Sequence, residues 1–220
     1  MALGPDGALY VAQNGGLFGA SEAATPGVQV VRNGQVEYFA TGMDAPNDLA
    51  FGPDARLWVT DTRAEIDFHA PEGGLPGRLW ACTMGTGEPQ LIVECGPVFI
   101  NGLGFTRDAT TLLVTATLSS QLIGYRFAGA TQSTWSDPNT VHVFDDGWPD
   151  GLAVGARGEA WVALTAADRI DVIDIEGARV ASIALPTGSL PTNICVGDPR
   201  FDELFVTAAH AGSLLRIRFP

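Results

Sequence analysis

Short segments in which apolar and polar residues alternate recur along the whole chain. Each begins at an apolar residue, passes through a polar turn built from Gly, Pro, Asp or Arg, and continues as a strand with an aromatic or β-branched face. The five segments are LGPDGALYVA (3–12), FGPDARLWVT (51–60), FTRDATTLLVT (105–115), VGARGEAWVA (154–163) and VGDPRFDELFVT (196–207). The alternation predicts half-buried β-strands that follow tight turns.

The five segments also predict how the strands are grouped. They start at residues 3, 51, 105, 154 and 196, so the interval is about 50 residues, the length of one four-stranded blade. Further strand candidates fill each interval, such as GVQVVRN, GRLWACTM, QLIGYRFA and RIDVIDIEG, with VEYFATG and PQLIVECG after two of them. We expect an all-β protein, a β-propeller with about five blades in a single domain over residues 1–220. A solenoid or a two-sheet sandwich is the alternative, but sandwiches lack such self-similarity.

Charge and composition exclude several kinds of partner. The formal net charge is −13 and only 12 residues are Lys or Arg, so the chain lacks the clustered cations that bind nucleic acid. No apolar run approaches the ~18 residues of a membrane span, and the start has no secretory signal. We expect a soluble cytoplasmic protein, with the oligomeric state left open. The three cysteines lie in or beside apolar stretches and are expected to be buried.

One polar position recurs four residues before the apolar start of the repeats. It holds Asn47, Asn101, Asp150 and Thr192. Innermost strands of successive blades line the central channel of a propeller, so these residues would form a ring of oxygen donors. Hard cations such as Ca²⁺ take carboxylate and amide oxygens, so the ring predicts a divalent-metal site. The alternative is that Asn and Asp merely start turns, as both residue types often do.

The sequences around this position carry a family resemblance. APNDLAFGPD with LWVTD, INGLGFTRD with LLVTAT, WPDGLAVGARGEAWVA, and LPTNICVGDP with LFVTAA are similar to successive blade motifs of the gluconolactonase, regucalcin (senescence marker protein) and luciferin-regenerating enzyme family. The resemblance implies a six-bladed propeller with one divalent metal, held by a Glu of the first blade, an Asn of the NGL motif and an Asp of the PDG motif. The last two correspond to Asn101 and Asp150, and Asn47 of the PND motif is similar to the family residue that contacts substrate or a metal-bound water.

Three departures from the family pattern stand out. The chain shows five repeats where the family has six blades, so we expect the first blade, with the Glu ligand, to be missing from an incomplete N-terminus. An Arg found two residues before the PND Asn in some members is Ala45 here. Glu65 lies at the spacing of a second substrate-contacting acid, but the sequence between differs from the family.

The activity implied by the resemblance is hydrolysis of a small lactone, with sugar lactones as the expected class. The metal would act as a Lewis acid and Asp150 as general base. Ca²⁺ is the first expectation, with Zn²⁺, Mn²⁺ and Mg²⁺ as alternatives. A non-catalytic propeller that binds calcium or a small molecule, and a phosphotriester hydrolase, remain open. The chain has no GxSxG, Walker, GxGxxG or HExxH motif, and His69, His142 and His210 show no metal-ligand spacing.

Overall fold

The computed structural model describes residues 1–18, 22, 24–63, 66–70, 73–128, 138–197, 202–210 and 212–219. These residues form antiparallel β-sheets, with a 3-10 helix, η2, at Thr165–Ala167. No helix within these ranges is long and apolar enough to cross a membrane. The predicted all-β architecture is therefore confirmed.

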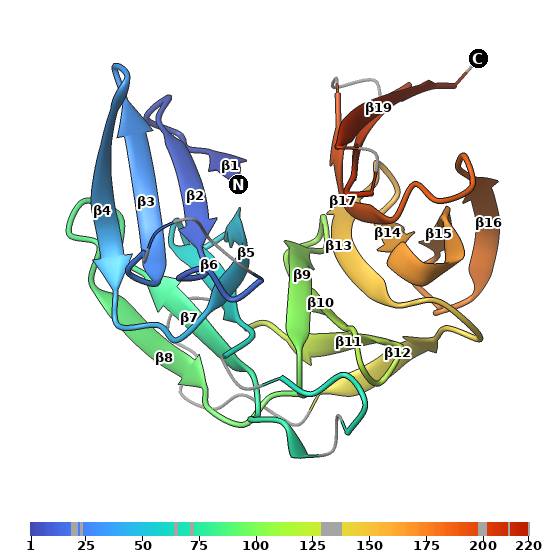
Figure 1. The fold of residues 1–220 in the computed structure, drawn as a ribbon, viewed down its shortest axis with the longest axis horizontal. Helices are drawn as coiled ribbons and strands as arrows, with labels where there is room; N and C mark the ends of the chain where they lie inside the picture. The colour runs from blue at the N-terminus through green and yellow to red at the C-terminus, as the bar shows by residue number, and fades with distance from the viewer. Residues whose placement is uncertain are drawn as a thin grey trace. The chain divides into compact units, whose positions relative to one another are not determined.

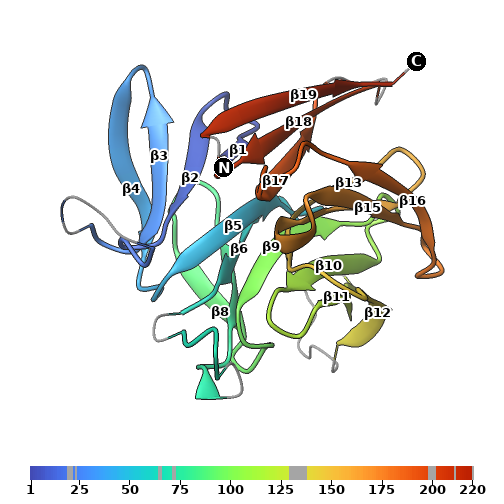
Figure 2. The same ribbon diagram turned by 45° about the vertical axis from the view of Figure 1, so that its right-hand side comes forward.

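Five sheets follow one another along the chain, each a meander of sequential strands (Figure 1, Figure 2). Four sheets have four strands and the last has three, among the described residues. The strands are β1 Ala2–Leu3, β2 Leu9–Gln13, β3 Gly27–Arg32 and β4 Gln35–Thr41; β5 Pro46–Phe51, β6 Leu57–Asp61, β7 Arg78–Cys82 and β8 Pro89–Val93; β9 Ile100–Phe105, β10 Thr111–Ala116, β11 Gln121–Arg126 and β12 Asn139–Val143; β13 Pro149–Val154, β14 Ala160–Leu164, β15 Arg169–Ile173 and β16 Arg179–Ala184; β17 Pro191–Val196, β18 Glu203–Ala208 and β19 Ser213–Arg218. Each sheet is one blade of a β-propeller, and the five blades match the five sequence repeats.

The described residues divide into two compact units, one up to Asn101 and one from Gly102 onward. The first unit holds blades one and two, whose core joins Tyr10 and Val28 to Leu49 and Val59. The second holds most of blade three with blades four and five, and its core includes a cluster around Leu122 and Val162 and another around Ile170 and Val206. The prediction of a single domain over residues 1–220 stays a prediction.

The repeated turn motif has a physical cause, seen best in FGPDARLW. Asp54 caps the turn by accepting the Arg56 amide at 3.2 Å, and it also accepts the Trp58 indole N–H at 3.0 Å. The indole lies close to Gly52, where a Cβ would meet Trp58 Nε1 at 2.6 Å. The glycine, the acid and the aromatic residue are thus parts of one turn.

Two other blades build similar turns, with the acid before the turn amide in blade one and after it in blade four. In blade one, Asp6 accepts the Ala8 amide at 3.2 Å and the Tyr10 hydroxyl at 3.0 Å. In blade four, Glu159 accepts the Arg157 amide at 2.8 Å and the Trp161 indole at 3.3 Å. Each turn fixes the register in which the two strands leave it.

The expectation that all three cysteines are buried is wrong for two of them. Cys82 is buried at the end of β7, but Cys95 and Cys195 are exposed. Cys95 follows β8, the last strand of its sheet, and Cys195 lies on β17, an edge strand of its sheet, beside the buried Ile194. On such strands a single apolar neighbour does not place a residue in the core.

Candidate functional site

The residues of the predicted ring share one structural position. Asn47, Asn101, Asp150 and Thr192 are each the second residue of the first strand of a blade, respectively β5, β9, β13 and β17. The side chain of Asn101 is buried, and the other three are partly exposed. The alignment of the repeats therefore corresponds to a real structural equivalence.

A β-bulge marks this position in three blades. Between Pro46 and Leu49 the register of β5 against β6 shifts, and the same happens between Pro149 and Leu152 and between Pro191 and Asn193. A bulge removes residues from the strand ladder and re-aims their side chains, which is why bulges are frequent beside active sites. It also leaves main-chain carbonyls that need other partners.

In the first unit, threonine hydroxyls supply those partners around Asn101. Thr62 Oγ1 donates to the Ile100 carbonyl at 2.7 Å, and Thr60 Oγ1 donates to the Asn101 carbonyl at 2.6 Å. Both threonines are buried. The carbonyls on both sides of the Asn101 Cα are thereby held, so the backbone from which this side chain projects is fixed.

The second unit repeats the arrangement around Asp150. Thr117 Oγ1 donates to the Pro149 carbonyl at 2.8 Å and Thr115 Oγ1 to the Asp150 carbonyl at 2.5 Å. Thr165 Oγ1 lies 2.8 Å from the Pro191 carbonyl and 3.2 Å from Asp150 Oδ2. Both candidate metal ligands therefore project from a backbone held by a pair of threonines.

Sequence reasoning missed these threonines, although a signal was present. The second strand of blade two ends in VTDT (59–62), and that of blade three ends in VTAT (114–117). Both hydroxyls of each T-x-T pair face the first strand of the following repeat in the sequence. A Thr repeated at alternate positions of equivalent strands is the pattern that could have found them.

The glycines of the NGL and PDG motifs allow main chains to approach closely. Within the second unit, a Cβ on Gly102 would lie 2.7 Å from the Asp150 carbonyl oxygen. A Cβ on Gly151 would overlap the side chain of Asn193. Glycine is required at these positions because neighbouring first strands pack against its Cα.

A buried carboxylate holds the loop that leads to Asn47. Asp61 is fully buried at the end of β6, and its Oδ1 accepts the amides of Ala45 at 2.7 Å and Arg63 at 3.3 Å. Its Oδ2 accepts the Asp44 amide at 3.1 Å and the Trp80 indole N–H at 3.0 Å. Each carboxylate oxygen of Asp61 thus accepts two hydrogen bonds. Ala45, which stands where some family members have an Arg, is buried.

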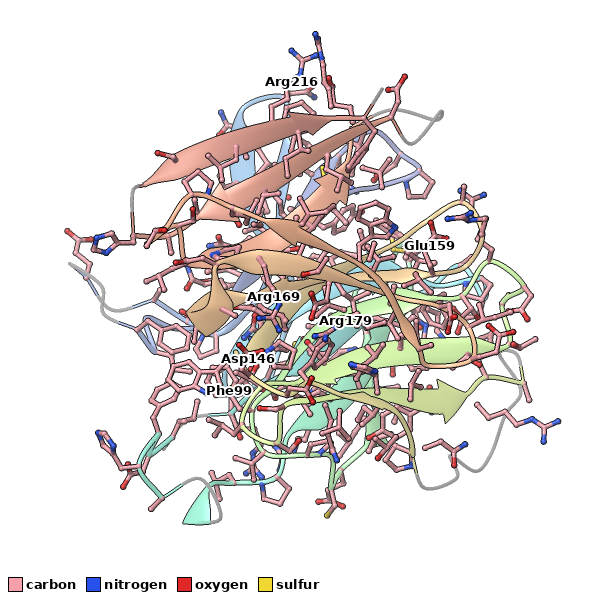
Figure 3. All side chains as sticks on the ribbon, turned by 90° about the vertical axis from the view of Figure 1, so that its right-hand side faces the viewer. Phe99, Asp146, Glu159, Arg169, Arg179 and Arg216 are labelled. Atoms are coloured by element: carbon pink, nitrogen blue, oxygen red, sulfur yellow. The ribbon has the colours of Figure 1, made fainter. Side chains whose placement is uncertain are left out.

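Acidic residues also order the loops before β13 and β17. Figure 3 shows Asp146 beside Arg169, whose Nη1 lies 3.0 Å from Asp146 Oδ2. Because of this hydrogen bond, the pKa of Asp146 is lowered and that of Arg169 is raised. Asp168 accepts the amides of Leu190 at 2.9 Å and Gly188 at 2.6 Å, and these bonds lower the pKa of its carboxyl.

The predicted residues are brought together only in part. Asn47 Nδ2 donates to Thr62 Oγ1 at 3.1 Å, and Thr62 Oγ1 donates to the Ile100 carbonyl, next to Asn101. These groups belong to the first unit, whereas Asp150 belongs to the second. Glu65 lies outside the described residues. Within the described ranges, no group of three or more His, Cys, Asp and Glu could hold a metal. Asn47, Asn101 and Asp150 each offer an oxygen donor, the kind of ligand that a hard cation takes.

Comparison with known proteins gives the family context. Residues 1–210 match the family model described as the SMP-30/Gluconolactonase/LRE-like region. The pentonolactonase XacC of Haloferax volcanii is 29% identical over 76% of this chain and 55% of its own length. Regucalcin of Xenopus laevis is 32% identical over 51% of this chain and 38% of its own. The chain therefore spans about half the length, or less, of these curated relatives.

Solved structures agree on the fold. A gluconolactonase of Xanthomonas campestris superposes with a TM-score of 0.78 at 19% identity, over 99% of this chain and 70% of its own. A calcium-binding regucalcin of Agrobacterium tumefaciens gives a TM-score of 0.74 at 17% identity, over 98% of this chain and 74% of its own. With the match over residues 1–210, the chain belongs to the SMP-30/gluconolactonase/LRE-like family of β-propellers.

Proposed function

We propose that the protein hydrolyses a small lactone, of the sugar-lactone class, at a divalent-cation site that includes Asn101 and Asp150. The observation that carries the proposal is the family match combined with the shared position of these residues at the second place of β9 and β13. The names of relatives support it, among them the pentonolactonase, a putative sugar lactone lactonase of Bacillus subtilis and the gluconolactonase.

The chemistry of the donors suits the proposed cation. The amide oxygen of Asn101 and the carboxylate of Asp150 are hard ligands, so Ca²⁺ is the first candidate, with Zn²⁺, Mn²⁺ and Mg²⁺ as alternatives. A bound cation would polarise the lactone carbonyl and stabilise the negative charge that develops there. The threonine pairs around both residues would keep these oxygens in place, since positioned ligands depend on their outer partners.

The side chains have separate tasks in the proposed reaction. Asp150 would take a proton from water as the water oxygen forms a bond to the lactone carbonyl carbon. The ring C–O bond then breaks, the ring oxygen receives a proton, and the product is a hydroxy acid. Asn47 would orient the substrate, and Asn101 would hold the cation.

Asp150→Asn tests the proposal. We expect it to abolish cation-dependent lactone opening, followed by acid release with a pH indicator over a panel of lactones and cations. Stability should stay within about 1–2 kcal/mol, the usual scale of one substitution. Asp108→Asn is the matched control, because Asp108 caps an exposed turn through Thr106 and Thr110 and uses Oδ1 for these bonds, which the amide oxygen of Asn can replace. Unchanged turnover in Asp150→Asn would refute the assignment, and turnover of phosphotriesters alone would replace lactones as the substrate class.

A second candidate is cation binding without turnover. It is favoured by the regucalcin relatives and by the structural neighbour described as a calcium-binding protein. Calorimetric binding of Ca²⁺ by a chain that opens no lactone of the panel would support this function over hydrolysis.

A further inference from the structure

The hydroxyl of Thr62 connects two of the candidate site residues. Its Oγ1 lies 2.7 Å from the Ile100 carbonyl oxygen and 3.1 Å from Asn47 Nδ2. Thr62 is 1% exposed, so water does not compete for these bonds. All these groups belong to the first compact unit.

Hydrogen-bond chemistry determines the direction of both contacts. A main-chain carbonyl only accepts, so the single proton of the Thr62 hydroxyl is used on Ile100. The hydroxyl oxygen can then offer only a lone pair to Asn47. The Asn47 group that faces Thr62 must therefore be the NH₂ group, because two acceptors would repel each other. The amide oxygen of Asn47 is consequently turned away from Thr62.

The other end of the Asn47 amide is available for a ligand. Across the described parts of the chain, no residue donates a hydrogen bond to Asn47 Oδ1, and the side chain is partly exposed. The neighbouring groups are already engaged: Thr60 Oγ1 accepts the Asp48 amide at 3.0 Å, and Asp48 Oδ1 accepts the Leu49 amide at 2.9 Å. Asn47 thus presents an acceptor beside an Asp48 amide and an Asp48 Oδ1 that already have partners.

We propose that Thr62 is a positioning residue that sets the orientation of the Asn47 amide, so that this position recognises a ligand group that donates a hydrogen bond, namely a hydroxyl. The orientation follows from the Thr62 geometry alone. The identity of the ligand as a hydroxylated lactone rests on the proposed function. A lactone whose hydroxyls are methylated would offer Asn47 no donor and would lose this contact.

The orientation is tested by NMR of the Asn47 side-chain amide, identified by its disappearance in Asn47→Asp. Thr62→Val replaces the hydroxyl with a methyl group, and Thr62→Ser keeps the hydroxyl. We expect the Asn47 NH₂ protons to exchange with solvent at least about 10-fold faster in Thr62→Val than in wild type or Thr62→Ser, because a hydrogen bond of roughly 1.4 kcal/mol corresponds to that factor. Equal exchange in all three proteins would overturn the proposal.

A matched variant separates this effect from a general loss of stability. Thr117→Val removes a hydroxyl that bonds the Pro149 carbonyl at 2.8 Å in another blade. We expect it to leave the exchange of the Asn47 amide at the wild-type rate. Faster exchange in Thr117→Val equal to that in Thr62→Val would mean that the fold as a whole had loosened, and would also overturn the proposal.

Kinetics test the ligand class. Thr62→Val should lower kcat/KM for a hydroxylated lactone about 10- to 100-fold, the usual effect of an outer partner, and Thr62→Ser should restore it. For the O-methylated lactone, Thr62→Val should lower kcat/KM less than about 3-fold, well below the 10- to 100-fold effect on the hydroxylated lactone. Equal losses for both lactones would refute recognition of a hydroxyl. If the wild type opens no lactone, the proposed function fails, whereas the exchange measurement still decides the role of Thr62.

Discussion

Replacing Asp61 with Asn should strongly destabilise the protein, although the two side chains have nearly the same shape. The carboxylate is fully buried and accepts four donors, two on each oxygen. An amide has one oxygen and one NH₂ group. In either orientation, the new amide side chain would keep two of the four bonds and direct its own N–H groups at the other two donors.

The size of the effect follows from the lost bonds. A hydrogen bond to a charged group contributes about 1.5–3 kcal/mol, so the loss of two should lower the free energy of unfolding by about 3–6 kcal/mol. Two of the donors are the amides of Asp44 and Ala45, in the loop before Asn47. The substitution should therefore also disturb the loop that leads into β5.

Urea unfolding followed by tryptophan fluorescence measures this loss, since Trp80 is one of the four donors. Asp174→Asn is the matched control. Among the described residues, only Oδ1 of Asp174 accepts hydrogen bonds, from the amides of Glu176 at 3.1 Å and Ala178 at 2.8 Å. The amide oxygen of Asn can therefore replace it. We expect a change below about 1 kcal/mol in the control. Equal effects in both variants would refute the reasoning.

Two further predictions concern titratable groups. Burial raises the pKa of the Cys82 thiol to about 12. A thiol reagent at pH 8 should therefore label the exposed Cys95 and Cys195 in the folded protein, and Cys82 only after unfolding. Rapid labelling of Cys82 in the folded state would contradict its burial. The bonds from the loop amides lower the pKa of the Asp168 carboxyl, so their contribution to stability is fully present above the ordinary pKa of 3.8 and is lost as pH falls through the lower pKa of the folded state. An NMR titration of this carboxyl should have its midpoint below 3.8. A midpoint at or above 3.8 would contradict the bonds to the loop amides.

The blade architecture could be predicted from the sequence because its cause is local. In blades one, two and four the turn carries its own glycine, acid and aromatic residue, as Gly52, Asp54 and Trp58 show. The strand alternation follows from one buried face. The position of Asn47, Asn101 and Asp150 could also be predicted, because equivalent strands place equivalent residues alike.

Other features depend on contacts that a single segment does not contain. The bond from Thr62 to the Ile100 carbonyl joins residues 38 positions apart, and that from Thr115 to Asp150 joins residues 35 apart. The exposure of Cys195 depends on the place of β17 at the edge of its sheet. Local pattern carries no information on such pairings until the strands are arranged.

Calorimetric titration with Ca²⁺ tests the central claim most directly, namely that Asn101 and Asp150 serve one cation. We predict a single binding site in the wild type, a large loss of affinity in Asn101→Ala and in Asp150→Asn, and no additional loss when the two substitutions are combined, because either one already dismantles the site. Binding that persists unchanged in both single variants, or losses that simply add, would contradict the account.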